Sequence, residues 1–171
     1  MSINIIAAMD KQRAIGHQNK LLTHLPSDLK YFKELTQNQV VVMGRVTFES
    51  ILDQLGHPLV NRTNLIVTND YHYQVDYGNC YVYNSINDIL NDYYEHVEGE
   101  TDIWIIGGSQ IYNEFLPHAD KLYLTIIDHK FEDVDTYFPA VSDEWKVTSK
   151  QSIKADEQNE YDHHFLVYEK K

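Results

Sequence analysis

Two stretches of the sequence pass from an apolar, strand-like run through glycine into a helix-like segment. In one, Gly107 and Gly108 separate the two segments, and in the other Gly44 stands directly before Arg45 and close to Thr47. Glycine lets the backbone approach a ligand closely, and a helix N-terminus offers unpaired N–H groups and partial positive charge. Two such turns in one domain could hold two phosphate regions of one nucleotide. A tight turn without any ligand has the same pattern, and the third glycine of the Rossmann fingerprint is missing.

A carboxylate stands on an otherwise apolar face of a predicted helix, residues 26–36. Asp28 shares this face with Phe32, which in turn lies beside Leu29 and Leu35. The carboxylate is either buried for function or lies at the edge of the face, as a charge that favours the helix start. If it is buried, desolvation raises its pKa and suits it to acid–base chemistry and hydrogen bonding.

The net charge of −12 argues against binding to nucleic acid or anionic membranes, because both need a basic surface. An anionic small ligand needs only a local basic pocket, and the chain has just three arginines, among them Arg45 and Arg62.

The single cysteine, Cys80, excludes an internal disulfide and favours a reducing compartment. Since the sequence shows neither a signal-peptide pattern nor a long apolar run, we expect a cytoplasmic protein. No metal site is expected, since His163 and His164 are adjacent in a predicted strand and face opposite sides.

Short apolar runs alternate with helix-like segments along the chain. We expect strands at residues 3–9, 40–43, 64–68, 80–83, 102–106, 121–128, 145–153 and 163–169, and helices at 26–36, 46–54, 85–95 and 109–115. Residues 10–24 are expected to form a long loop. The pattern predicts a single α/β domain over residues 1–171, with a central, mostly parallel twisted sheet of about eight strands, an antiparallel C-terminal edge and about four flanking helices.

The chain resembles the dihydrofolate reductase family, of the bacterial type, in an ordered series of short motifs from end to end. Each motif is weakly specific alone, whereas the ordered set is highly specific. The motifs are Ile5-Ile6-Ala7-Ala8, Ala14-Ile15-Gly16 with Asn19, Leu25-Pro26-Ser27-Asp28-Leu29 with Phe32-Lys33, Val42-Met43-Gly44-Arg45, Thr47-Phe48-Glu49-Ser50-Ile51, Leu59 with Asn61-Arg62, Ile106-Gly107-Gly108 with Ile111-Tyr112, Leu122-Tyr123-Leu124-Thr125 with Ile127-Asp128, and Asp135-Thr136 with Phe138-Pro139.

The resemblance implies that the enzyme reduces dihydrofolate with NADPH, by hydride transfer to C6 and protonation at N5. It implies that Asp28 hydrogen-bonds the 2-amino group and N3 of the pterin, and that Thr125 orients Asp28. Leu21 and Thr23 would complete the catalytic set, and Arg62 would pair with the α-carboxylate of the folate glutamate tail. The remaining substrate contacts would come from Ile6, Ala7, Ala8, Leu29, Phe32, Ile51, Leu59, Ile106 and Tyr112.

For the cofactor, the resemblance implies that the two glycine turns hold NADPH and that Arg45 and Thr68 lie near its 2′-phosphate. The family has a cis peptide between its paired glycines, and the loop at residues 10–24 would be a mobile lid over the nicotinamide. The expected cofactor contacts are Ala8, Ile15, Gly16, Asn19, Gly44, Arg45, Val46, Thr47, Thr68, Asn69, Ile106, Gly107, Gly108, Ser109, Gln110, Ile111 and Tyr112.

The sequence departs from the family pattern in two places. Leu22 and Thr23 stand where the family usually has proline and tryptophan, which predicts a roomier pocket and altered proton delivery. Val46 and Asn69 are less favourable to phosphate than the residues often found there, which leaves the strength of the preference for NADPH over NADH open. Two alternatives stay open: a reductase of the same fold acting on another pterin or a pyrimidine of flavin synthesis, and a catalytically weak paralogue that binds NADPH and folate. We expect a monomer.

Overall fold

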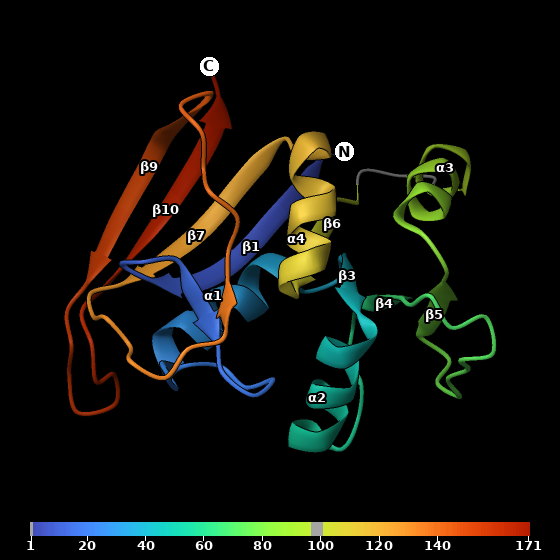
Figure 1. Ribbon diagram of the computed structural model, residues 1–171, viewed down its shortest axis with the longest axis horizontal. Coiled ribbons are helices and arrows are strands. Elements are labelled where there is room, and N and C mark those ends of the chain that lie inside the picture. The colour runs from blue at the N-terminus through green and yellow to red at the C-terminus, as the bar shows by residue number, and fades with distance from the viewer. Residues whose placement is uncertain (1, 97–100) are drawn as a thin grey trace.

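The computed structural model describes residues 2–96 and 101–171, and side chains 93–96 are left undescribed. An eight-stranded sheet runs through the molecule in the order β5-β4-β3-β6-β1-β7-β10-β9 (Figure 1). Its strands are β1 (Ile3–Asp10), β3 (Val40–Gly44), β4 (Thr63–Val67), β5 (Cys80–Tyr83), β6 (Ile103–Gly107), β7 (Lys121–Ile127), β9 (Trp145–Ile153) and β10 (His163–Lys170).

The first six of these strands pair in parallel, and β7, β10 and β9 pair antiparallel at one edge. The helices are α1 (Pro26–Thr36), α2 (Arg45–Leu55), α3 (Ile86–His96) and α4 (Ser109–Phe115), followed by a single 3-10 turn, η1 (Leu116–His118). The predicted fold class, a mostly parallel sheet with an antiparallel C-terminal edge and four helices, is confirmed.

The segment predicted to be a loop contributes one strand to a second, two-stranded sheet. It pairs β2 (Ala14–Gly16) with β8 (Thr136–Tyr137), which the sequence analysis missed. The remainder of the segment at residues 10–24 has the expected irregular form. The two short strands therefore tie the expected lid to a distant part of the chain.

Successive residues of β1 point into two different cores, one on each face of the sheet. Ile5 packs in the cluster that includes Ile89 of α3 and Phe115 of α4, whereas Ile6 packs in the cluster that includes Phe48 of α2. Strands buried on both faces explain why the parallel strands read as continuous apolar runs. Within the described residues, no helix is long and apolar enough to cross a membrane.

The carboxyl ends of β3, β6 and β1 meet at one edge of the sheet, because the three strands are neighbours and run in parallel. In open α/β sheets, ligands bind in the crevice outside the carboxyl ends of the strands. The two glycine turns found in the sequence follow β3 and β6 directly, and they therefore lie side by side at this edge.

Candidate active site

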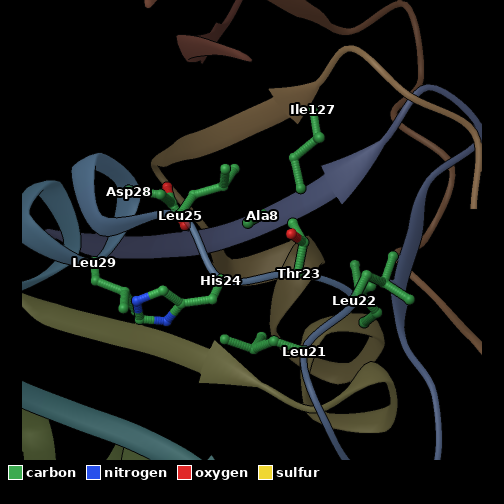
Figure 2. A pocket seen from close by; sticks show the side chains of 10 residues that line it. Ala8, Leu21, Leu22, Thr23, His24, Leu25, Asp28, Leu29 and Ile127 are labelled. Atoms are coloured by element: carbon green, nitrogen blue, oxygen red, sulfur yellow. The ribbon is translucent and has the colours of Figure 1, made fainter. Parts of the chain in front are cut away.

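A cleft of about 1320 Å³ opens at the carboxyl ends of the parallel strands. Every residue predicted to bind substrate or cofactor lines it except Thr125, and Leu21 lines it too. Thr125 lies behind Asp28, and Thr23 lines a smaller cavity of about 30 Å³ that shares Asp28 and Ala8 with the cleft. Figure 2 shows this smaller cavity, with Thr23 beside Ala8 of β1 and Asp28 at the start of α1. The structure thus brings the predicted residues together in one region.

The Asp28 carboxylate is half-buried in the first turn of α1. The hydroxyl of Thr125 donates a hydrogen bond of 2.7 Å to its Oδ1. Burial raises the pKa of Asp28 above 3.8, and this effect outweighs the lowering by the Thr125 hydrogen bond and by nearby His163. Of the two possibilities that the helical spacing left open, the structure favours the buried carboxylate. A carboxyl group with a raised pKa can hold or release a proton closer to neutral pH.

The first residue of the turn after β6 has a backbone conformation that favours glycine. The Gly107–Gly108 peptide is cis, as the resemblance implied, and Gly107 has a φ of 125°, which side-chain-bearing residues rarely adopt. A Cβ on Gly107 would lie 3.3 Å from the hydroxyl of Tyr112, and this hydroxyl donates to the carbonyl oxygen of Ile6 at 2.8 Å. Tyr112 therefore packs against this turn and joins it to β1, and both glycines line the cleft.

The turn after β3 offers a second backbone surface. Gly44 precedes the 11-residue helix α2, and among the described residues no side chain caps the N-terminus of that helix. A Cβ on Gly44 would lie 3.3 Å from Ile111, and a Cβ on Gly108 would lie 3.5 Å from Oγ1 of Thr47. The two turns therefore face each other across a narrow gap with N–H groups available, which fits the pyrophosphate of a dinucleotide.

At the far end of this gap, Arg45 is held by acidic and aromatic neighbours. Its Nε donates to Glu49 at 2.9 Å, its Nη1 donates to Asp70 at 3.2 Å, and the guanidinium lies 4.2 Å from the ring centroid of Tyr73. Thr68 lines the cleft nearby. The sequence analysis missed both carboxylates. The i, i+4 spacing of Arg45 and Glu49 on a helix was an available signal, but Asp70 had none.

A second arginine lies at the other end of the cleft. Arg62 is buried, and it donates from Nε to the carbonyl of Val60 at 2.9 Å and from Nη1 to the hydroxyl of Thr36 at 3.2 Å. Burial lowers the pKa of its guanidinium, which remains a cation at neutral pH. Because two bonds fix the guanidinium plane at the cleft, the group suits planar recognition of a carboxylate.

The expected lid is tied down at two points over the cleft. The N–H of Gln18 donates to Asp135 at 2.9 Å, and the hydroxyl of Ser50 on α2 donates to the carbonyl of Asn19 at 2.9 Å.

His24, which was not predicted from the sequence, lines both the cleft and the smaller cavity. Among the described residues, no cluster of three or more potential metal ligands is present.

Comparison with known proteins agrees with this geometry. The family model described as dihydrofolate reductase matches residues 2–170. The dihydrofolate reductase of Bacillus subtilis strain 168 is 44% identical, over 99% of this chain and 95% of the relative. That of Staphylococcus haemolyticus is 37% identical, over 99% and 96%. A solved structure of dihydrofolate reductase from Enterococcus faecalis, complexed with NADP(H) and RAB-propyl, superposes with a TM-score of 0.87 at 37% identity and covers 99% of this chain and 96% of that one. The chain belongs to the dihydrofolate reductase family.

Proposed function

We propose that this chain catalyses the NADPH-dependent reduction of 7,8-dihydrofolate to 5,6,7,8-tetrahydrofolate, with Asp28 as the group that holds the pterin. The observation that carries the assignment is a half-buried carboxylate, fixed by Thr125, at the apolar end of a cleft whose other end has two glycine turns. The relative from Enterococcus faecalis, which binds NADP(H), supports the same cofactor here.

The side chains around Asp28 bind and orient the flat heterocycle. The carboxylate accepts hydrogen bonds from the 2-amino group and N3, while Leu29, Phe32 and Ile51 form apolar walls that keep water from the reacting face. NADPH, when bound, supplies the hydride that is delivered to C6. Because burial raises the pKa of Asp28, the carboxyl group exchanges a proton with the site nearer neutral pH and favours protonation at N5.

The residues at the strand ends would hold the cofactor. Backbone N–H groups at Gly44 and Gly108 would bind its pyrophosphate, Ala8 and the lid would contact its nicotinamide, and Arg45 would bind its 2′-phosphate. The residues that line this one cleft therefore suit the binding of both NADPH and dihydrofolate.

The direct test is an absorbance assay of NADPH loss that depends on added dihydrofolate. We expect Asp28→Asn to lower kcat by at least about 100-fold, the scale of a lost acid–base group. Asp143→Asn, at an exposed acid outside the cleft, is the matched control and should behave as the unsubstituted protein. If the unsubstituted chain shows no dihydrofolate-dependent loss of NADPH, the proposal is wrong.

Arg62 distinguishes dihydrofolate from another pterin or a flavin-pathway pyrimidine, because only a glutamate tail offers its guanidinium a carboxylate. Arg62→Lys should raise KM for dihydrofolate and leave KM for dihydropteroate, which lacks the tail, unchanged. A catalytically weak paralogue would bind NADPH without this turnover. We also infer a cytoplasmic location, supported by the single, buried Cys80, which cell fractionation tests. We infer a monomer as well, which gel filtration tests.

A further inference from the structure

A buried histidine lies directly behind the helical turn that carries Asp28. His163 is the first residue of β10, is fully buried, and pairs with Ile127 of β7. Its Nε2 lies 2.5 Å from Oγ of Ser27, and its Nδ1 lies 2.8 Å from the carbonyl oxygen of Tyr161. A carbonyl oxygen only accepts, so Nδ1 of the neutral ring carries the proton and Nε2 accepts from the Ser27 hydroxyl.

The connection between β9 and β10 supplies a second contact to the same turn. Oδ1 of buried Asn159 accepts from the backbone N–H of Ser27 at 3.0 Å, and Asn159 is itself held by Oδ1 of Asp156. Leu25, at the N-cap of α1, has an apolar side chain that cannot cap the helix. Asn159 therefore caps the N-terminus of α1, although it lies 132 residues from Ser27 in the sequence.

We propose that His163 is a positioning residue for Asp28: together with Asn159 it fixes Ser27, and so fixes the first turn of α1 with the Asp28 carboxylate directed at the cleft. This inference rests on the proposed function, in which Asp28 holds the pterin. Thr125 of β7 holds the carboxylate itself, and His163 of the neighbouring strand β10 holds the side chain of Ser27, the residue before Asp28. The antiparallel pair β7 and β10 thus orients Asp28 through two contacts, one to its carboxylate and one to the preceding residue, Ser27.

Two carboxylates and one ring form the electrostatic surroundings of His163. They are Asp28 on α1, Asp156 in the β9–β10 connection, and Phe165, whose ring centroid lies 5.5 Å away at an angle of 69°. Burial raises the pKa of Asp28 and the Thr125 hydrogen bond lowers it, so a first turn that His163 no longer fixes should weaken that bond and raise the pKa of Asp28 further.

His163→Phe and His163→Gln separate positioning from packing. Phenylalanine keeps a ring but removes both nitrogens, and we expect kcat/KM for dihydrofolate to fall about three- to ten-fold, the scale of one net hydrogen bond. KM for NADPH should stay unchanged, because its contacts follow β3 and β6. The pH midpoint assigned to Asp28 should move upward. Glutamine can still accept from Ser27, and should restore most of the lost kcat/KM.

His164→Phe is the matched control, since this neighbour faces the other side of the strand and pairs with Oγ of Ser152 at 2.7 Å. Its kinetics should equal those of the unsubstituted protein. Ser27→Ala removes the same hydrogen bond without touching the buried ring, and should match the loss in His163→Phe. The double variant should lose nothing further, because both substitutions break one bond.

A readout independent of activity is ¹⁵N NMR of histidine-labelled protein, which should show the His163 proton on Nδ1. The inference is overturned if the proton lies on Nε2. It is also overturned if His163→Phe keeps the dihydrofolate kinetics of the unsubstituted protein, or if dihydrofolate and NADPH parameters fall together without a change in the pH midpoint. Failure of the proposed function looks different: the unsubstituted protein itself would then show no dihydrofolate-dependent turnover.

Discussion

Thr125 and Asp28 are 97 residues apart in the sequence and are joined by a hydrogen bond of 2.7 Å from the threonine hydroxyl to Oδ1 of the carboxylate. Thr125 is only 2% exposed, so water does not compete for its hydroxyl group. The bond connects β7 to the first turn of α1 and fixes the direction in which the acid points. Geometry and acidity at this site therefore depend on the same contact.

Thr125→Val keeps the branched shape and removes the hydroxyl. Because the lost hydrogen bond favoured the ionised form of Asp28, the pKa of Asp28 should rise further above 3.8. The midpoint in the pH profile of kcat/KM for dihydrofolate should move upward, and its maximum should fall about ten-fold, as for a hydrogen bond to a charged group. Thr148→Val on exposed β9 is the control. A midpoint that stays in place would contradict the prediction.

Asp28→Asn should stabilise the folded protein at neutral pH while it removes activity. Burial raises the pKa of Asp28 above its unfolded value of 3.8. Between these two values the folded chain keeps a proton that the unfolded chain loses, so stability falls as pH rises through this window. The full cost is present above the folded pKa and absent below 3.8.

Thermal unfolding at two pH values checks this expectation. At pH above the folded pKa, Asp28→Asn should raise Tm, by about 2–4 °C for each kcal/mol in a chain of this length. The difference between the two proteins should shrink as pH falls toward 3.8. An asparagine variant with an equal or lower Tm at neutral pH would show that the charge carries no desolvation cost.

The main sheet was predictable from the sequence because its strands are continuous apolar runs buried on both faces. Residues 40–43, for example, are all buried in β3. The pairing of β2 with β8 was not predictable, since β8 is two residues long and its partner lies more than a hundred residues earlier. Strands this short carry no period that could be recognised.

The site was predictable only as far as local patterns and family motifs extend. Helical spacing placed Asp28 on an apolar face but could not tell a buried carboxylate from one at the edge. The contacts of Ser27 with His163 and of Arg45 with Asp70 join residues far apart in sequence, and neither pair leaves a local pattern. Such contacts form only when the sheet brings distant segments of the chain together.

Asp70→Asn should increase the preference for NADPH over NADH. In the protein as it is, the charge of Arg45 is shared with Glu49 and Asp70, and Val46 beside it contributes no charge. If the 2′-phosphate binds at Arg45 as proposed, it lies next to these two carboxylates. Removing one should raise the ratio of kcat/KM values for NADPH and NADH about two- to five-fold, the scale of an exposed ion pair.

NADH, which lacks the 2′-phosphate, serves as the internal control for this variant. Its kcat/KM should stay unchanged, and so should KM for dihydrofolate, whose proposed site is at the other end of the cleft. Added salt should reduce the difference between the two proteins, because exposed charges are screened. Equal changes for NADPH and NADH would mean that Asp70 acts on cofactor binding in general and not on the phosphate.

Thr23→Trp should change how protons reach the site. Thr23 and Asp28 line the same cavity of about 30 Å³, beside Leu22 and Ile127. A cavity needs about 10–15 Å³ to hold one water, so this space admits water next to the acid. The indole ring would fill it and desolvate Asp28 further, so the midpoint of the pH–rate profile for dihydrofolate reduction should move to higher pH.

Thr23→Val separates the two properties of this residue, because valine keeps the size of threonine and removes only its hydroxyl. If cavity volume controls proton delivery, Thr23→Val should keep the midpoint of the unsubstituted protein while Thr23→Trp shifts it. If the hydroxyl binds the delivering water, Thr23→Val should lower kcat at high pH, where protons are scarce. An unchanged pH–rate profile in Thr23→Trp would refute a role for the cavity, since the bulky ring cannot enter without displacing what the cavity holds.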